Sequence, residues 1–78
     1  MIMLGLMVSE AEMEELKYLV RREMEEILFD SEDPRIDERI KETLQTRYQV
    51  LFQLLKRIGT EQDVMPYLPR YNKNIVNT

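Results

Sequence analysis

Residues 34–58 read PRIDERIKETLQTRYQVLFQLLKRI, and this stretch decides the fold because it carries the clearest helical period in the chain. At about 100° per residue, its apolar side chains recur at steps of three and four and share one side. Asp33 before Pro34 predicts the start of a helix, and Gly59 predicts its end. We therefore expect an amphipathic helix over residues 34–58. Its apolar side holds Ile36, Ile40, Leu44, Tyr48, Leu51, Leu54, Leu55 and Ile58.

A second amphipathic helix is expected over about residues 9–29. Ser9 and Glu12 have the spacing of a capping box, in which each side chain bonds the backbone N–H of the other residue. The segment between the two helices is short and polar, which favours antiparallel neighbours. The fold class we predict is therefore all-α, an antiparallel helical hairpin. The apolar line of this helix consists of Met13, Leu16, Val20, Met24 and Ile27.

Charge supports the pairing of these two helices. Residues 9–29 contain seven acids and three bases, a net charge of −4, whereas residues 34–58 contain three acids and six bases, a net charge of +3. Opposite net charges attract, although each exposed ion pair contributes only about 0–1 kcal/mol.

The two ends of the chain differ from the hairpin. Residues 1–8, MIMLGLMV, form an apolar arm that is shorter than the roughly 20 residues that span a bilayer. This arm could dock on its own chain, dock on a neighbour or lie at a membrane surface, and residues 1–6 could precede a native start at Met7. Thr60 predicts a short third helix to about Met65, so residues 9–65 form the hairpin domain. Residues 66–78, with two prolines, are expected to form an extended tail.

Composition excludes several chemistries. The 78 residues include no cysteine and no histidine, which removes thiol nucleophiles, the commonest general base and the usual zinc ligands. Four glutamates could in principle act on a metal or a proton, but most of them lie off the apolar line and are expected to face solvent. We expect no catalytic residue, no metal site and no cofactor, and therefore no enzyme. These glutamates are Glu12, Glu15, Glu23 and Glu26.

The helix over residues 34–58 is apolar on more than one side near its centre, which is more than one neighbouring helix can cover. The arm, the tail, a second copy of the hairpin or another protein could cover the rest. We favour a second copy, because two hairpins form a four-helix bundle whose core compensates for the small size of the chain. The predicted interaction surface consists of Tyr48, Val50, Leu51, Phe52, Leu54 and Leu55.

Arg47 interrupts the apolar side of the same helix and therefore must extend to solvent or meet an anion. Glu23 is the obvious partner by type. In a hairpin closed at residues 30–33, however, Arg47 would lie level with Leu16, roughly 10 Å from Glu23. A pair between Glu23 of one chain and Arg47 of a second chain is therefore a hypothesis, and simple extension to solvent is its alternative.

Taken together, these features predict a small non-enzymatic protein-interaction module, a cytoplasmic homodimer without a membrane span that acts as an adaptor or regulator of an unidentified protein partner. The alternative is a small DNA-associated regulator that uses the basic face of the second helix. Nucleic acid is disfavoured by interspersed acidic residues and by the net charge of −4. The basic residues of this alternative are Arg35, Arg39, Lys41, Lys56 and Arg57.

Overall fold

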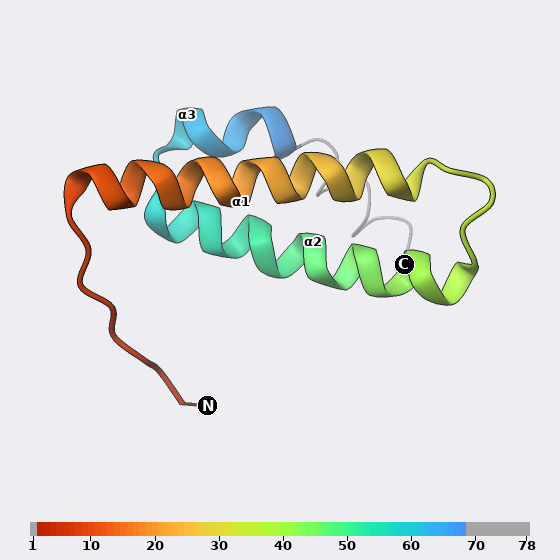
Figure 1. Cartoon of the computed structure of the whole chain (residues 1–78), viewed down its shortest axis with the longest axis horizontal. Helices are drawn as coiled ribbons and strands as arrows, with labels where there is room; N and C mark the ends of the chain where they lie inside the picture. The colour runs from red at the N-terminus through yellow and green to blue at the C-terminus, as the bar shows by residue number, and fades with distance from the viewer. Residues whose placement is uncertain (1, 69–78) are drawn as a thin grey trace.

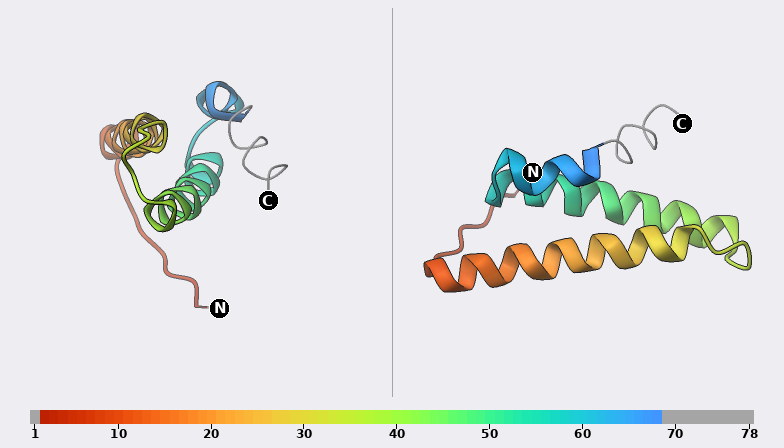
Figure 2. Two further views of the ribbon diagram at one scale, coloured as in Figure 1. Left: turned by 90° about the vertical axis from the view of Figure 1, so that its right-hand side faces the viewer. Right: turned by 90° about the horizontal axis from the view of Figure 1, so that it is seen from above.

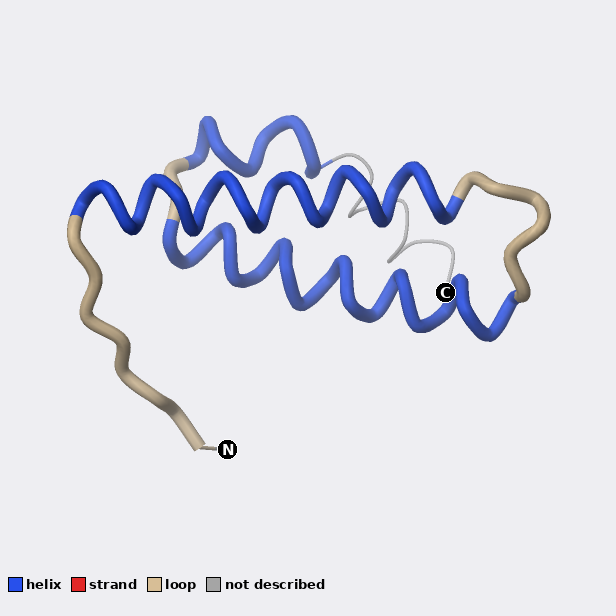
Figure 3. The backbone as a smooth tube through the Cα atoms, viewed as in Figure 1, coloured by secondary structure: helices blue, strands red, loops and turns tan. Residues whose placement is uncertain are grey.

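The computed structural model describes residues 2–68, and every regular element among them is helical (Figures 1 and 3). Two long helices, α1 (Glu10–Ser31) and α2 (Glu38–Ile58), form an antiparallel hairpin. A short helix, α3 (Glu61–Val64), continues directly into a 3-10 turn, η1 (Met65–Tyr67). The all-helical prediction is confirmed for this part of the chain.

Helix α1 begins at the predicted capping box. The backbone N–H of Ser9 donates to Oε1 of Glu12 at 2.9 Å, and the backbone N–H of Glu12 donates to the Ser9 hydroxyl at 3.1 Å. These bonds satisfy two N–H groups that a helix leaves without partners at its start. The same bonds lower the pKa of Glu12 below its usual value.

Helix α2 starts later than predicted, at Glu38 instead of Pro34. Asp37 is its N-cap, and the side chain of Asp37 accepts from the backbone N–H of Arg39 at 3.1 Å. Asp33 forms a separate turn, because its carboxylate accepts from both the backbone N–H and the guanidinium of Arg35, at 2.9 and 3.0 Å. The loop between α1 and α2 therefore spans residues 32–37 and not 30–33.

The C-terminal segment differs from the predicted tail at its start. Pro66 lies inside η1, where its fixed backbone angle suits a first turn, so residues 66–68 continue the helical segment and are not extended. The rest of the predicted tail lies outside the described residues. Helix α3 and η1 pack on one side of the hairpin only (Figure 2, left).

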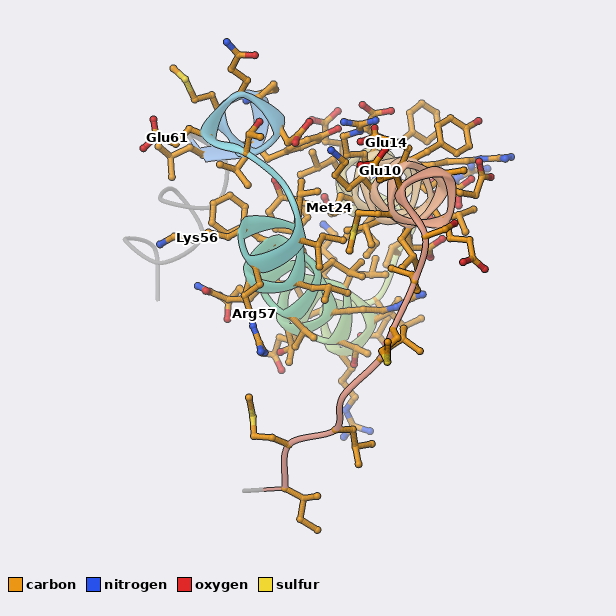
Figure 4. The ribbon with its side chains drawn as sticks, turned by 90° about the vertical axis from the view of Figure 1, so that its left-hand side faces the viewer. Glu10, Glu14, Met24, Lys56, Arg57 and Glu61 are labelled. Atoms are coloured by element: carbon orange, nitrogen blue, oxygen red, sulfur yellow. The ribbon has the colours of Figure 1, made fainter. Side chains whose placement is uncertain are left out.

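The core lies where α1, α2 and η1 meet. Met24 is fully buried and points from α1 into the space between the helices (Figure 4). Gly59, which ends α2, allows a close approach: a Cβ on Gly59 would lie 2.8 Å from Oδ2 of Asp63. The turn into α3 can therefore be tight. The buried core residues are Val20, Met24, Ile27, Tyr48, Phe52, Leu55 and Tyr67.

Candidate interaction surface

Helix α3 and η1 cover one side of the hairpin, and ion pairs hold α3 against α1. Asp63 of α3 accepts from Nη1 of Arg21 at 2.9 Å and lies 3.5 Å from Nζ of Lys17. Both cations belong to α1, so these ion pairs join α3 to a helix that is distant from it in the sequence. We call this the covered side.

Asp63 also stabilises its own turn. Its Oδ2 accepts from the backbone N–H of Thr60 at 2.7 Å and from the Thr60 hydroxyl at 3.1 Å. The Thr60 backbone N–H, followed by the Thr60 hydroxyl and Lys17, holds the pKa of Asp63 below its usual value. Lys17 has a raised pKa, first because it bonds Glu14 and then because it lies beside Asp63. The ionised forms of Asp63 and Lys17 are thus favoured in the folded chain.

Two tyrosines complete the covered side. The Tyr48 hydroxyl donates to the backbone carbonyl of Tyr67 at 3.2 Å, inside the core. The Tyr67 hydroxyl donates to Oε1 of Glu25 on α1 at 2.9 Å. Burial, followed by this bond to Glu25, raises the pKa of Tyr67 to about 12. Tyr67 therefore joins α1 and α2 through one aromatic ring and two hydrogen bonds.

No helix among residues 2–68 covers the opposite side of the hairpin, and we call that side the open face. On each helix, side chains at steps of three and four form a line along the helix that faces this side. This line lies roughly a quarter turn from the line of buried core side chains. The Arg47–Glu23 ion pair, which joins the two lines, marks the centre of the open face. Leu16, Leu19 and Glu23 of α1 form the open face together with Ile40, Leu44, Arg47, Leu51, Leu54 and Ile58 of α2, and Val50 lies at its outer edge.

The open face is largely apolar and partly exposed, and its residues Leu44, Leu51 and Ile58 also pack against the core. Val50 is 63% exposed, Ile40 is 53% exposed and Leu54 is 40% exposed. Helix α3 lies on one side of the hairpin in the view along the helices, and the helical spacing assigns the open face to the other side (Figure 2, left). An apolar face of this kind on a small chain indicates a site of contact with another surface.

The structure divides the predicted interaction surface in two. Tyr48, Phe52 and Leu55 are 1%, 2% and 0% exposed, so they belong to the core and not to an accessible surface of this chain. Phe52 is buried because η1, which contains Tyr67, covers the side of α2 from which Phe52 projects. Val50, Leu51 and Leu54 remain on or beside the open face. Half of the excess apolar surface of α2 is therefore covered by the C-terminal segment.

Glu23 and Arg47 pair within one chain, at 2.9 Å between Oε1 and Nη2. The expectation that these two residues are too far apart inside one hairpin is wrong, because it assumed a loop at residues 30–33. A loop at residues 32–37 moves the register of α2 along α1 and brings Arg47 level with Glu23. The Arg47 side chain is 56% exposed and the Glu23 side chain is 36% exposed, so both can still accept a further partner.

The remaining glutamates have structural contacts or face solvent. Glu12 caps α1, Glu26 lies 3.5 Å from Arg22 at the nearest atoms, and Glu15 is exposed. Among residues 2–68, no group of acidic side chains is arranged to hold a metal ion. No helix in the same range is long and apolar enough to cross a membrane. Open hollows on the outer side of α1, around Phe29, are shallow surface features.

Sequence reasoning missed the contacts that fix α3. The spacing of Thr60 and Asp63 repeats that of Ser9 and Glu12, and this signal indicates a local turn. The ion pairs of Asp63 with Lys17 and Arg21 depend on how α3 packs against α1, which no local pattern encodes.

Comparison of the chain with protein-family models, with curated proteins and with solved structures finds no match.

Proposed function

We propose that this protein is a small non-enzymatic protein-interaction module that self-associates through the open face and acts as an adaptor or regulator. The observation that carries the proposal is the contrast between a covered side and a second apolar side that no helix among residues 2–68 covers. The partner on the open face is a second copy of the chain, and two hairpins form a four-helix bundle.

Surface area supports an additional contact. The whole chain, arm included, exposes 6526 Å². A compact monomer of 9.5 kDa exposes about 5,000 Å². The difference is about 1,500 Å², more than the roughly 800 Å² that a standard protein interface removes from one partner. The arm contributes to this difference, since Leu4 is 91% exposed and Met7 is 98% exposed, so burial of the arm and the open face together would reduce it.

Charge favours a second copy over an unrelated apolar surface. Helix α1 contains eight acids and three bases, a net charge of −5, and α2 contains two acids and five bases, a net charge of +3. When α1 of one copy lies over α2 of the other, each contact joins an acidic helix to a basic helix. The same surface thus supplies both halves of a complementary pair.

The bundle leaves the outer side of α1 free for a different protein. Tyr18 and Phe29 are exposed there, with the Arg22–Glu26 ion pair between them. Exposed aromatic side chains beside charged groups are typical of protein-binding surfaces. In this proposal, the dimer presents two copies of this helix face to the proteins that it connects or regulates.

The test replaces open-face residues by a charged one. Leu54→Glu and Ile40→Glu, at opposite ends of the open face, should each weaken self-association at least about tenfold, because a glutamate would be buried without a partner. Both residues are partly exposed in the single chain, so circular dichroism should show unchanged helix content. Light scattering over a range of protein concentrations measures the association.

Phe29→Glu is the matched control. It replaces a large exposed apolar residue by the same charge on the outer side of α1 and should leave the association constant unchanged. Equal effects of Leu54→Glu and Phe29→Glu would contradict a specific role for the open face.

No observation favours the DNA alternative. Arg35 pairs with Asp33, and Lys41 lies 3.9 Å from Glu38. Lys56 and Arg57 point to different sides of α2 (Figure 4). A nucleic-acid surface needs its cations gathered along one face, and the predicted set of cations is spread around the helix.

A further inference from the structure

We infer that the apolar arm, residues 2–8, is exchanged between two copies of the chain and covers the end of α2 in the partner. This inference rests on the proposed self-association through the open face and adds a second contact to it.

The arm is the most exposed apolar segment among the described residues. Leu4 is 91% exposed and Met7 is 98% exposed, and the segment has no regular structure. In an extended segment, alternate residues share a side, so Ile2, Leu4 and Leu6 form one apolar edge. Exposed apolar edges of this kind are energetically costly in water, which favours a position where the edge is buried.

The start of α1 fixes the direction in which the arm leaves. Ser9 is extended, with φ −74° and ψ 168°, and the two capping-box hydrogen bonds hold it in place. From Ser9 the arm runs away from α1 and past α2, on the side opposite α3 (Figure 2, left, and Figure 4). The arm thus enters the space in front of the open face, where the second copy lies.

Charge determines which part of the second copy the arm meets. A two-fold axis parallel to the helices places acidic α1 over basic α2 of the partner, whereas an axis perpendicular to the helices within the interface places α1 over α1. The first arrangement is favoured because it joins opposite net charges. It also brings the start of α1 beside the end of α2 in the other copy, since both lie at the same end of each hairpin.

The length of the arm matches this target. Seven extended residues span about 23 Å. The last turns of α2, from Val50 to Ile58, span about 12 Å. The arm can therefore cross to the partner and lie along Val50 and Leu54, whose exposed side chains complete the apolar surface.

Cysteine cross-linking tests the exchange, because the chain contains no cysteine of its own. Gly5→Cys is a suitable probe, since nothing lies within 4 Å of a Cβ at this position. Arg57→Cys places the second probe beside Leu54 without removing an apolar contact. On mild oxidation, the double variant Gly5→Cys/Arg57→Cys should form a disulfide between chains, seen as a covalent dimer on a non-reducing gel.

Two controls define the result. Gly5→Cys/Lys56→Cys moves the second probe to another side of α2 (Figure 4) and should cross-link at least about tenfold more slowly. A mixture of isotope-labelled Gly5→Cys with unlabelled Arg57→Cys should give a disulfide that joins one labelled and one unlabelled chain, as mass spectrometry can verify.

The possible failures are distinguishable. A disulfide within one chain, seen as a monomeric band, would overturn the exchange, and so would a dimer of correct mass in which both probes stay reduced. A monomeric mass of the unmodified chain would instead contradict the proposed self-association on which the exchange rests.

Discussion

The two sides of the hairpin are built from the same two helices but are completed differently. On the covered side, α3 and η1 bury Phe52 and hold Asp63 between two cations of α1. On the open face, Ile40 and Leu54 stay accessible around one ion pair. Among the described residues, α3 and η1 cover one side of the two-helix core and not the other. The self-association that we propose would cover the second side.

The largest change in stability is expected from a substitution in η1, which covers one side of the hairpin. Tyr67→Ala eliminates a buried ring and its hydrogen bond to Glu25, whereas the backbone carbonyl that accepts from Tyr48 is retained. It should lower the free energy of unfolding by about 3 kcal/mol. Leu68→Ala, at a neighbouring and more exposed position, is the control and should cost less than about 1 kcal/mol. Urea unfolding followed by circular dichroism measures both, and similar losses would mean that Tyr67 does not hold α3 against the hairpin.

A smaller effect is expected from the ion pair of the open face. In the single chain, Arg47→Met should change the free energy of unfolding by less than about 1 kcal/mol, because the pair is exposed. In the dimer the same substitution leaves Glu23 buried without a partner and should weaken association by about 2 kcal/mol. The double variant Glu23→Leu/Arg47→Met should recover association. Loss of association in the double variant as well would show that the pair itself is required.

The smallest effect concerns the Tyr67 hydroxyl. Tyr67→Phe should cost about 1 kcal/mol near neutral pH, since it removes one hydrogen bond to a carboxylate. The pKa of Tyr67 is raised from 10.0 to about 12, so the neutral hydroxyl is favoured in the folded chain. Its contribution is complete below pH 10 and is lost as the pH rises towards 12.

The difference in stability between the natural chain and Tyr67→Phe should therefore shrink between pH 10 and pH 12. Urea midpoints at several pH values measure it. Tyr18→Phe, at an exposed tyrosine, serves as the control. A constant difference over this range would show that the Tyr67 hydroxyl is not buried against Glu25.

Local patterns predicted the helices well and their junctions less well. The capping box at Ser9 and the apolar periods depend only on neighbours in sequence, and these predictions are confirmed. Asp33 and Asp37 both have the chemistry of an N-cap, and the choice between them depends on the loop as a whole. The register of Arg47 against Glu23 follows from that choice, so one error in the loop moved the predicted pair by several residues.

The C-terminal segment shows a second limit of the sequence. Pro66 predicts a break in regular structure, yet it also fits the first turn of a 3-10 helix. Which role it takes depends on the burial of Tyr67 against two helices that are distant in sequence. The predicted interaction surface lies partly in the core and partly on the open face for the same reason. Periodicity identifies the apolar sides of α2 but not the element that covers each of them.

The most direct test of this account is the mass of the unmodified chain by sedimentation equilibrium, measured from dilute to concentrated solution. We predict a mass near twice 9.5 kDa that falls towards 9.5 kDa on dilution. A mass of 9.5 kDa at every concentration, with the helices intact by circular dichroism, would contradict the claim that a second copy covers the open face.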